Sequence, residues 1–312
     1  MQFDKLTLYR SYDLHTPDLP ERSVLYFLEP INVGAIECES LISYLIRLAE
    51  VHCVTSDKLI KHKIYPFFWG HDDLSVSCKG IVGRTFTNRS HIKLLNFSGW
   101  YTSKLVESLE ILTLRSDLTC LTMMHWHELI TYVYLLRDCK AWCPLCYSYW
   151  HQNKLPIYEP LLWSFEPVAV CPQHHYPLIT QCSHCNHKLP IIAPNSRTGY
   201  CNHCGEWLGN LEKYHIKSDG LYHSEIALQS ELIKILGSLI AFNNKVFDSE
   251  NTRFYKQIIA YFQLKELSSL ELSNHQISQK RIHKSMSYIK HTIEDFWKLS
   301  SRVALENASK HV

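Results

Sequence analysis

The sequence predicts a mostly α-helical protein with a small cysteine-rich module embedded in its middle, and three observations lead to this fold class. Apolar residues recur at helical spacing before residue 140 and again after residue 211. Between these stretches, residues 140–210 are rich in Cys, His, Trp, Tyr and Pro and show few helical periods. Seven of the 12 cysteines fall between Cys143 and Cys204, which is typical of a module whose own core is too small to stand alone.

The first helical stretch begins at Glu39 and is strongly amphipathic. Thr55 or Ser56 then predicts the cap of a second short helix that runs through His62, because a hydroxyl accepts the free N–H groups of a first helical turn. The stretch Tyr65–Gly83 is aromatic and rich in turn residues. The apolar positions of the first helix are Leu41, Ile42, Leu45, Ile46, Leu48 and Ala49.

A further helix is expected from near Tyr101, followed by a short helix that Ser116 or Asp117 would cap. Two short helices joined by a tight turn predict a helix-turn-helix, which reads DNA in some proteins and is a plain packing unit in others. The apolar residues expected in this pair are Leu105, Val106, Leu109, Ile111, Leu112, Leu118, Leu121 and Met124.

The cysteine-rich segment carries four ligand pairs, each with a spacer of two residues. Each pair places two ligands on one tight turn, and two turns complete the tetrahedron of thiolate and imidazole ligands that structural zinc prefers. The pattern therefore predicts two structural zinc ions, one held by three thiolates and an imidazole and the other by four thiolates. The predicted metal ligands are Cys143, Cys146, Cys171, His174, Cys182, Cys185, Cys201 and Cys204.

The spacing leaves the grouping of these ligands open, since both a sequential and an interleaved pairing satisfy it. His174 is preferred over His175 because it keeps the two-residue spacer. Gly205 follows the last ligand, where such a turn often needs a positive φ. A site with four protein ligands leaves no position for water, so both sites are expected to be structural and not catalytic.

These patterns divide the chain into four predicted parts. Residues 1–35 form a proline-punctuated N-terminal arm, residues 36–140 a helix-turn-helix domain, residues 141–210 a double zinc-finger module, and residues 211–312 a C-terminal helical domain. A basic cluster in the last part, around Lys280 and Arg281, reads as a solvated helix face or as a phosphate or RNA contact.

Several classes of function are disfavoured by the sequence. The net charge of +2 gives no protein-wide positive field of the kind that attracts nucleic acid. No apolar run is long enough to span a membrane. The N-terminus lacks a signal-peptide core, so a cytoplasmic protein is expected. Thr131 replaces the second histidine of an HExxH motif after His127-Glu128, and no GxGxxG or P-loop is present. No enzymatic activity is therefore predicted.

Several separate motifs resemble one family, the TniQ proteins. Glu39-Ser40-Leu41-Ile42-Ser43-Tyr44-Leu45-Ile46-Arg47-Leu48-Ala49 is similar to the family's opening E-S-x-x-S-[WY]-L-x-R-L-A helix. The Tyr65-Pro66 to Asp73 stretch is similar to its aromatic, acidic turn, and Lys104 to Met124 to its helix-turn-helix. Trp142-Cys143-Pro144-Leu145-Cys146, Trp163, Val170-Cys171-Pro172-Gln173-His174 and Cys182-Ser183-His184-Cys185 match in order and spacing. The resemblance covers about residues 30–210.

The resemblance implies a non-enzymatic target-selection role in DNA transposition. Proteins of this family bridge a target to the transposition machinery and are thought to recruit an AAA+ regulator. One class, TnsD-like, binds a duplex-DNA site directly. Members of the other class bind to a CRISPR effector complex of the Cascade type, which reads the target through its guide RNA. Some CRISPR-linked members act as head-to-tail dimers, so a homodimer is a further expectation. The shortness of the chain favours the CRISPR-linked adaptor over the autonomous DNA reader.

Two sequence features test this preference. A direct reader needs Arg or Asn on a recognition helix, and Arg115 and Arg137 are the nearest candidates in the N-terminal part. An adaptor needs exposed apolar or aromatic patches instead. In either case, changing Cys143 or Cys182 to Ser is expected to unfold the module and abolish recruitment, because a structural zinc site contributes on the order of 10 kcal/mol.

Overall fold

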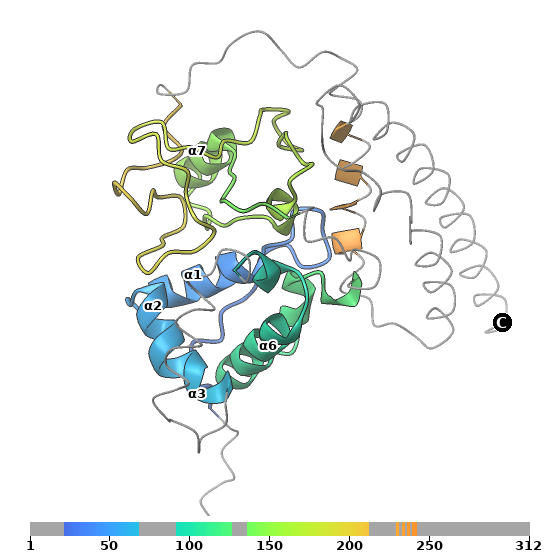
Figure 1. The fold of residues 1–312 in the computed structure, drawn as a ribbon, viewed down its shortest axis with the longest axis vertical. Coiled ribbons are helices and arrows are strands. Elements are labelled where there is room, and N and C mark those ends of the chain that lie inside the picture. Colours follow the sequence, from blue (N-terminus) through green and yellow to red (C-terminus); the bar gives the residue numbers. More distant parts are fainter. Residues whose placement is uncertain are drawn as a thin grey trace, which may run out of the picture.

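The computed structural model describes residues 22–68, 92–126 and 136–211, together with the helical residues 229–230, 233–234, 236–237 and 239–241 (Figure 1). Most of the predicted N-terminal arm, the acidic part of the aromatic turn and nearly all of the predicted C-terminal helical domain lie outside these residues. The predicted boundaries between the four parts stay predictions.

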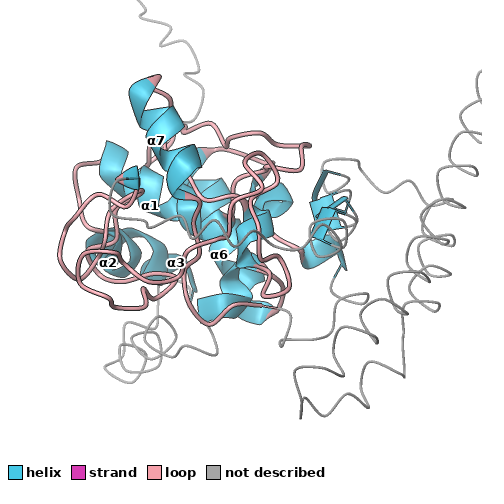
Figure 2. Cartoon of the chain, turned by 90° about the horizontal axis from the view of Figure 1, so that it is seen from above, coloured by secondary structure: helices cyan, strands magenta, loops and turns pink. Residues whose placement is uncertain are grey.

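Over the described residues, the fold is mostly helical, as predicted. Figure 2 shows helices and loops and no strand among the coloured residues, and β-structure there is limited to isolated bridges between single residue pairs. In Figure 1 the loop-rich segment around α7 (Pro144–Gln152) lies above a layer of four helices, α1, α2, α3 and α6. None of the described helices has the length and apolar character that a membrane crossing requires.

Helix α1 (Leu41–Val51) confirms the first predicted helix. Ser40 caps it with extended backbone, and its hydroxyl accepts from the Ser43 backbone N–H at 3.2 Å, which satisfies one of the donors that a helix start leaves free. All six predicted apolar positions are buried. The helix ends at His52, after which Cys53 adopts a φ of 54° and turns the chain.

The second helix is longer than predicted. Thr55 caps α2 (Ser56–Leu59), and its hydroxyl accepts from the Lys58 backbone N–H at 3.4 Å, as expected. The chain then continues through a π-helical turn, η1 (Ile60–Ile64), into α3 (Tyr65–Phe68). The expectation that this helix ends at His62 was wrong, because the buried side chains of Ile60 and Ile64 hold the following turns against the core.

The third predicted helix is α6 (Trp100–Thr113), which follows a 3-10 turn, η2 (Lys93–Asn96). Gly99 precedes it with a φ of 122°, a backbone conformation that L side chains rarely adopt. Ile111 was expected on the apolar face, yet its side chain is 52% exposed. The interior positions are Leu105, Val106, Leu109 and Leu112, spaced by one, three and three residues, so Ile111 falls on the outer side.

The helix-turn-helix expected over Lys104 to Met124 is not confirmed. Between α6 and residue 126 the chain makes two 3-10 turns, η3 (Leu118–Leu121) and the shorter η4 (Met124–Trp126). Asp117 precedes η3, but its side chain makes no capping hydrogen bond. The second α-helix that the motif needs is therefore not found within residues 114–126.

Two hydrophobic cores stabilise the described fold. The larger one joins α1, η1, η2 and α6 to the 3-10 turn η6 (Leu161–Ser164) and to apolar residues that flank the ligand pairs. The smaller one is built from cysteines and aromatic rings and surrounds α7. Single residues such as Val168 and Val170 belong to the larger core although they lie in the predicted zinc module, so the module packs on the helices and does not form a separate body.

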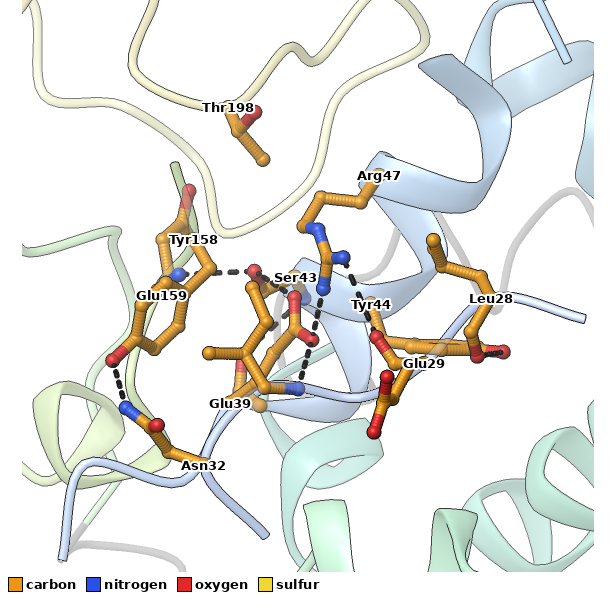
Figure 3. A network of polar contacts seen from close by, with 12 residues as sticks. Leu28, Glu29, Asn32, Glu39, Ser43, Tyr44, Arg47, Tyr158, Glu159 and Thr198 are labelled. Carbon is orange, nitrogen blue, oxygen red and sulfur yellow. Dashed lines mark hydrogen bonds and ion pairs between the residues drawn. The ribbon is translucent and has the colours of Figure 1, made fainter. Parts of the chain in front are cut away.

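A buried polar network fastens α1 to the module (Figure 3). The Glu39 carboxylate is fully buried, pairs with the Arg47 guanidinium, and accepts hydrogen bonds from the Ser43 hydroxyl at 2.9 Å and the Ile31 backbone N–H at 3.2 Å. The Ser43 hydroxyl oxygen in turn accepts from the Glu159 backbone N–H at 2.9 Å. Glu39, Ser43 and Arg47, polar residues of the segment that resembles the family's opening helix, therefore make their contacts inside the protein.

Candidate metal centres

The first group of predicted ligands meets between α7 and the loop after η6. Cys143 is the residue before the first turn of α7, and Pro144 occupies the first helical position, where its missing N–H costs no hydrogen bond. The Nδ1 atom of His174 lies 3.3 Å from the Cys146 Sγ, 3.6 Å from the Cys171 Sγ and 3.7 Å from the Cys143 Sγ. All four ligand atoms therefore face one point.

These distances fit a tetrahedral metal ion. Zinc bonds of about 2.3 Å to sulfur and about 2.0 Å to nitrogen give tetrahedron edges of about 3.8 Å between sulfurs and about 3.5 Å between sulfur and nitrogen. The Cys146 and Cys171 sulfurs are 3.5 Å apart. Because all four positions are filled by protein atoms, a metal in this group would hold the fold and would have no open position for chemistry.

The second group consists of the four remaining predicted ligands. The sulfurs of Cys182 and Cys204 lie 3.8 Å apart, as do those of Cys185 and Cys201, which is the edge length of a four-thiolate zinc site. The ligand atoms of each group lie within 4.8 Å of one another. The structure thus brings the eight predicted side chains together in the sequential grouping and not in the interleaved one.

Three of the four ligand pairs are built on the same backbone turn. In each, the fourth residue after the first cysteine donates its N–H to that cysteine's carbonyl, at 2.9 Å for His175, Asn186 and Gly205. Each of these residues has a positive φ, of 49°, 56° and 77° respectively. The expectation of a positive φ at Gly205 is confirmed, and His175 occupies the turn position while the His174 Nδ1 faces the three sulfurs.

Aromatic rings fill the space between the two groups. Trp142 and Tyr147 are fully buried, and the Tyr147 ring lies 5.9 Å from the Trp207 ring, measured between centroids. A Cβ atom added to Gly199 would come within 2.3 Å of the Trp207 ring, and one added to Gly209 within 2.7 Å. Two glycines therefore make room for the ring that connects the second group to the core around the first.

The remaining histidines of the segment lie at its rim. His184 and His187 are exposed, as is His203, and the His187 and His203 rings stack with centroids 3.7 Å apart. The His187 and His203 ring nitrogens also come within 4.8 Å of the Cys185 Sγ. Since Cys185 already belongs to the second group, these two histidines bring only two ligand atoms of their own, which is fewer than a tetrahedral site needs.

The three sulfurs of the first group share one negative charge, since the pKa of Cys171 is lowered whereas the pKa values of Cys143 and Cys146 are raised. The thiols of Cys143 and Cys146 donate hydrogen bonds that lower the pKa of Cys171 far below the usual value of a thiol. His174 adds a further hydrogen bond to the same sulfur and acts in the same direction. A thiolate among close sulfurs is the state in which cysteine binds a metal.

The two arginines proposed as DNA readers are engaged within the protein. The Arg115 guanidinium donates to both carboxylate oxygens of Asp117, at 2.8 and 2.6 Å, and its Cζ lies 4.5 Å over the Phe27 ring. Arg137 is buried and donates to the backbone carbonyls of Glu166 and Val168. Neither side chain extends into solvent, so the structure does not bring them together as a base-reading surface.

Sequence reasoning missed a buried ion pair between the helices and the module. The Lys140 ammonium pairs with the Glu159 carboxylate, and both side chains are at most 10% exposed. Glu159 also accepts, through its backbone carbonyl, a hydrogen bond of 3.0 Å from the Ser40 N–H at the start of α1. Neither residue lies in a motif, and only their position beside the first ligand pair and beside η6 could have marked them.

Comparison with known proteins supports the resemblance found in the sequence. The model of the TniQ family matches residues 30–178. A comparison with curated proteins gives no match. The matched residues include α1, α6 and the whole of the first ligand group. Residues 30–178 therefore form a TniQ domain, a non-catalytic domain of transposon-associated target selection.

Proposed function

We propose that the chain is a non-enzymatic adaptor that links a CRISPR guide-RNA effector complex to the AAA+ regulator of transposition. Two structural zinc ions, one in each ligand group, would hold the adaptor in shape. The observation that carries the proposal is a difference between two sets of side chains. Arg115 and Arg137, the candidate base readers, make contacts inside the protein, whereas large apolar side chains face solvent. Cytoplasmic location and the homodimer remain part of the proposal.

The solvent-facing side chains come from three neighbouring segments, which we call the apolar surface. The Leu25 N–H donates to the Leu112 carbonyl at 2.8 Å, and the Tyr26 N–H donates to the His52 Nε2 at 2.9 Å. These bonds hold the chain start against the ends of α6 and α1. The members of the surface are Val24, Tyr26, Phe27, Val51, Ile111 and Leu114, and each is at least 43% exposed.

A cluster of exposed apolar side chains is a sign of a protein-binding surface. Tyr26 and Phe27 are 58% and 56% exposed, and aromatic residues dominate the binding energy of many protein interfaces. The surface also lies next to well-anchored elements, since α1 is fixed to the module by the Glu39 network. A rigid surface binds with little loss of conformational entropy, which suits a bridging protein.

The test is capture of a purified effector complex by the zinc-loaded chain. The double variant Tyr26→Ser and Ile111→Ser should lose capture, because both side chains are exposed and their loss leaves the core intact. Leu155→Ser is the matched control, since Leu155 is 45% exposed but lies after α7, outside the apolar surface. Full capture by the double variant would exclude this surface, and absence of capture by the wild type would exclude the adaptor.

An autonomous reader of duplex DNA is the second candidate. The observation that favours it is a row of exposed basic residues on α2 and η1, opposite to the buried Leu59 and Ile60. Selection of random duplex DNA by the zinc-loaded chain at near-physiological salt separates the two functions. One enriched motif would establish a direct reader, and salt-sensitive binding without a motif would leave target reading to the guide RNA.

A further inference from the structure

A small polar cavity lies where the residue before α1 meets η2, η6 and the segment before the first ligand pair. Its volume is about 20 Å³, which is room for one water molecule or one slightly larger group. None of the eight candidate metal ligands lines it, so the cavity is separate from both ligand groups. The lining residues that matter for its chemistry are Lys93, Arg137, Lys140, Glu159 and Trp163.

Two nitrogen donors of the lining residues have no hydrogen-bond partner among the described residues. They are the Nε atom of Arg137 and the Nε1 atom of Trp163. Arg137 is 7% exposed and Trp163 is 3% exposed, so bulk water does not satisfy these donors. Both N–H groups can donate but cannot accept, and a buried donor without an acceptor costs free energy. The cavity therefore calls for a hydrogen-bond acceptor.

Other contacts hold both donors in place. A terminal nitrogen of the Arg137 guanidinium donates to the backbone carbonyls of Glu166 and Val168. The Trp163 ring stacks with the Trp150 ring, with centroids 6.1 Å apart. Neither side chain can turn toward another acceptor without breaking these contacts, so the acceptor has to come to the cavity.

The charge of the lining favours an anion as that acceptor. Lys140 pairs with Glu159, which is the only acid in the lining. The other two lining cations, Lys93 and Arg137, pair with carboxylates that are 71% and 59% exposed, and such exposed pairs offset little of the cost of burying a cation. Burial lowers the pKa of Arg137 even though the nearby Glu166 acts in the opposite direction.

We propose that this cavity binds one small monovalent anion of the size of chloride, held by the N–H donors of Arg137 and Trp163 and by the charge of Lys93. A monatomic anion accepts hydrogen bonds from any direction and needs no donor in return. The volume excludes a nucleotide or an acidic peptide, and the surplus of positive charge disfavours a metal cation.

The bound anion would join the helices to the module. Lys93 belongs to η2 and Trp163 to η6, while Arg137 precedes the first ligand pair. A ligand that binds the folded chain and not the unfolded chain stabilises the fold by mass action. This inference goes beyond the proposed adaptor function and does not depend on it, because it is tested with the chain alone.

The experiment measures the melting temperature of the full zinc-loaded chain as chloride is raised at constant ionic strength. A bulky organic sulfonate, which is too large for the cavity, replaces chloride in each sample. Each tenfold increase in chloride above the dissociation constant should raise the melting temperature by about 3 to 6 °C.

Two variants test the assigned residues through this chloride-dependent rise and not through stability itself. Trp163→Phe removes the indole N–H and should abolish most of the rise. Its matched control is Trp150→Phe, which changes a buried ring of the same aromatic cluster that does not line the cavity. Lys93→Gln should shift the rise to higher chloride, whereas Lys104→Gln on α6 should leave it unchanged.

Anomalous scattering from crystals grown in bromide locates the anion directly. One bromide within hydrogen-bond distance of the Arg137 Nε and the Trp163 Nε1 is expected, at the halide concentrations that raise the melting temperature. The proposal is overturned if chloride and the sulfonate give equal melting temperatures, if Trp163→Phe keeps the full rise, or if the cavity holds only water.

Discussion

The two ligand groups share one spacing in the sequence but have different surroundings in the fold. The sulfurs of the first group belong to cysteines that are at most 2% exposed, beneath α7 and a set of stacked aromatic rings. In the second group, Cys185 and Cys204 are only half buried, and exposed loop residues surround them. The first group therefore lies at the centre of a hydrophobic core, whereas the second group joins loops at the surface.

This difference predicts how far the loss of each site should affect the stability of the rest of the molecule. The loop between the two ligand pairs of the first group carries Glu159, which contacts the start of α1 through its backbone and Lys140 through its carboxylate. The second group reaches the core mainly through the Trp207 ring and through the loop that holds Thr198 against Glu50. Loss of the first site should propagate into the helices, and loss of the second should stay local.

The largest effect is expected for Cys143→Ser. A structural zinc site contributes on the order of 10 kcal/mol, and this ligand is buried where the module meets the helices. The variant should lose the metal ion of the first group and loosen the packing of the module on the helices, and the cooperative thermal transition of the whole described fold should drop or disappear. Circular dichroism and calorimetry measure this change.

Cys53→Ser is the control for that experiment. Cys53 is an exposed free cysteine outside both ligand groups, so its variant should keep the metal content and melting temperature of the wild type. A Cys143→Ser protein with unchanged stability would show that the first group does not hold the fold.

A smaller and more local effect is expected for Cys204→Ser. The loss of the second site should open residues 182–208 to protease and to hydrogen exchange, while α1 and α6 keep their protection, because Cys185 and Cys204 are only half buried and local unfolding need not spread through the whole molecule. Hydrogen exchange followed by mass spectrometry resolves the two regions. Equal loss of protection in the helices would remove the distinction between the two sites.

The buried ion pair gives the next effect in size. Lys140→Met leaves the Glu159 carboxylate buried without its partner, and breaking such a pair costs about 3 to 5 kcal/mol. Denaturant unfolding should show this loss. The double variant Lys140→Met and Glu159→Leu should recover much of it, since no unpaired charge remains, and a double variant no better than the single one would argue against the ion-pair account.

The smallest effect concerns pH and Glu39. Burial raises the pKa of the Glu39 carboxyl to about 7, although the Arg47 charge opposes the shift. Because the folded pKa lies above the unfolded one, the stability from proton binding is fully present below about pH 4.5 and is lost as pH rises towards 7. Glu39→Gln should remove this part of the pH dependence, about 1 to 3 kcal/mol, in unfolding experiments between pH 5 and 8. An unchanged pH profile would contradict the shift.

Much of the site was predictable because metal ligation leaves a direct trace in sequence. The two-residue spacers indicate a tight turn, and Gly205 shows its positive φ. Likewise, the apolar spacing of α1 predicts its buried face. Both signals are local, so they survive without knowledge of the tertiary structure.

The misplaced features all depend on distant partners. Nothing near Arg137 in the sequence indicates that it donates to the Val168 carbonyl, and Ile111 continues an apolar run although it faces solvent. The grouping of the ligands was also open until the fold brought Cys143 to His174. Local pattern therefore identifies candidate ligands and helices, whereas tertiary contacts decide which cations and apolar side chains remain free for binding.

The most direct test of the central claim is the metal content of the intact chain by native mass spectrometry. Two structural sites predict two zinc ions in the wild type, one in Cys143→Ser and one in Cys204→Ser, with loss of fold stability in the first variant far greater than in the second. A wild-type chain that carries no zinc, or a single ion that both variants retain, would contradict the account.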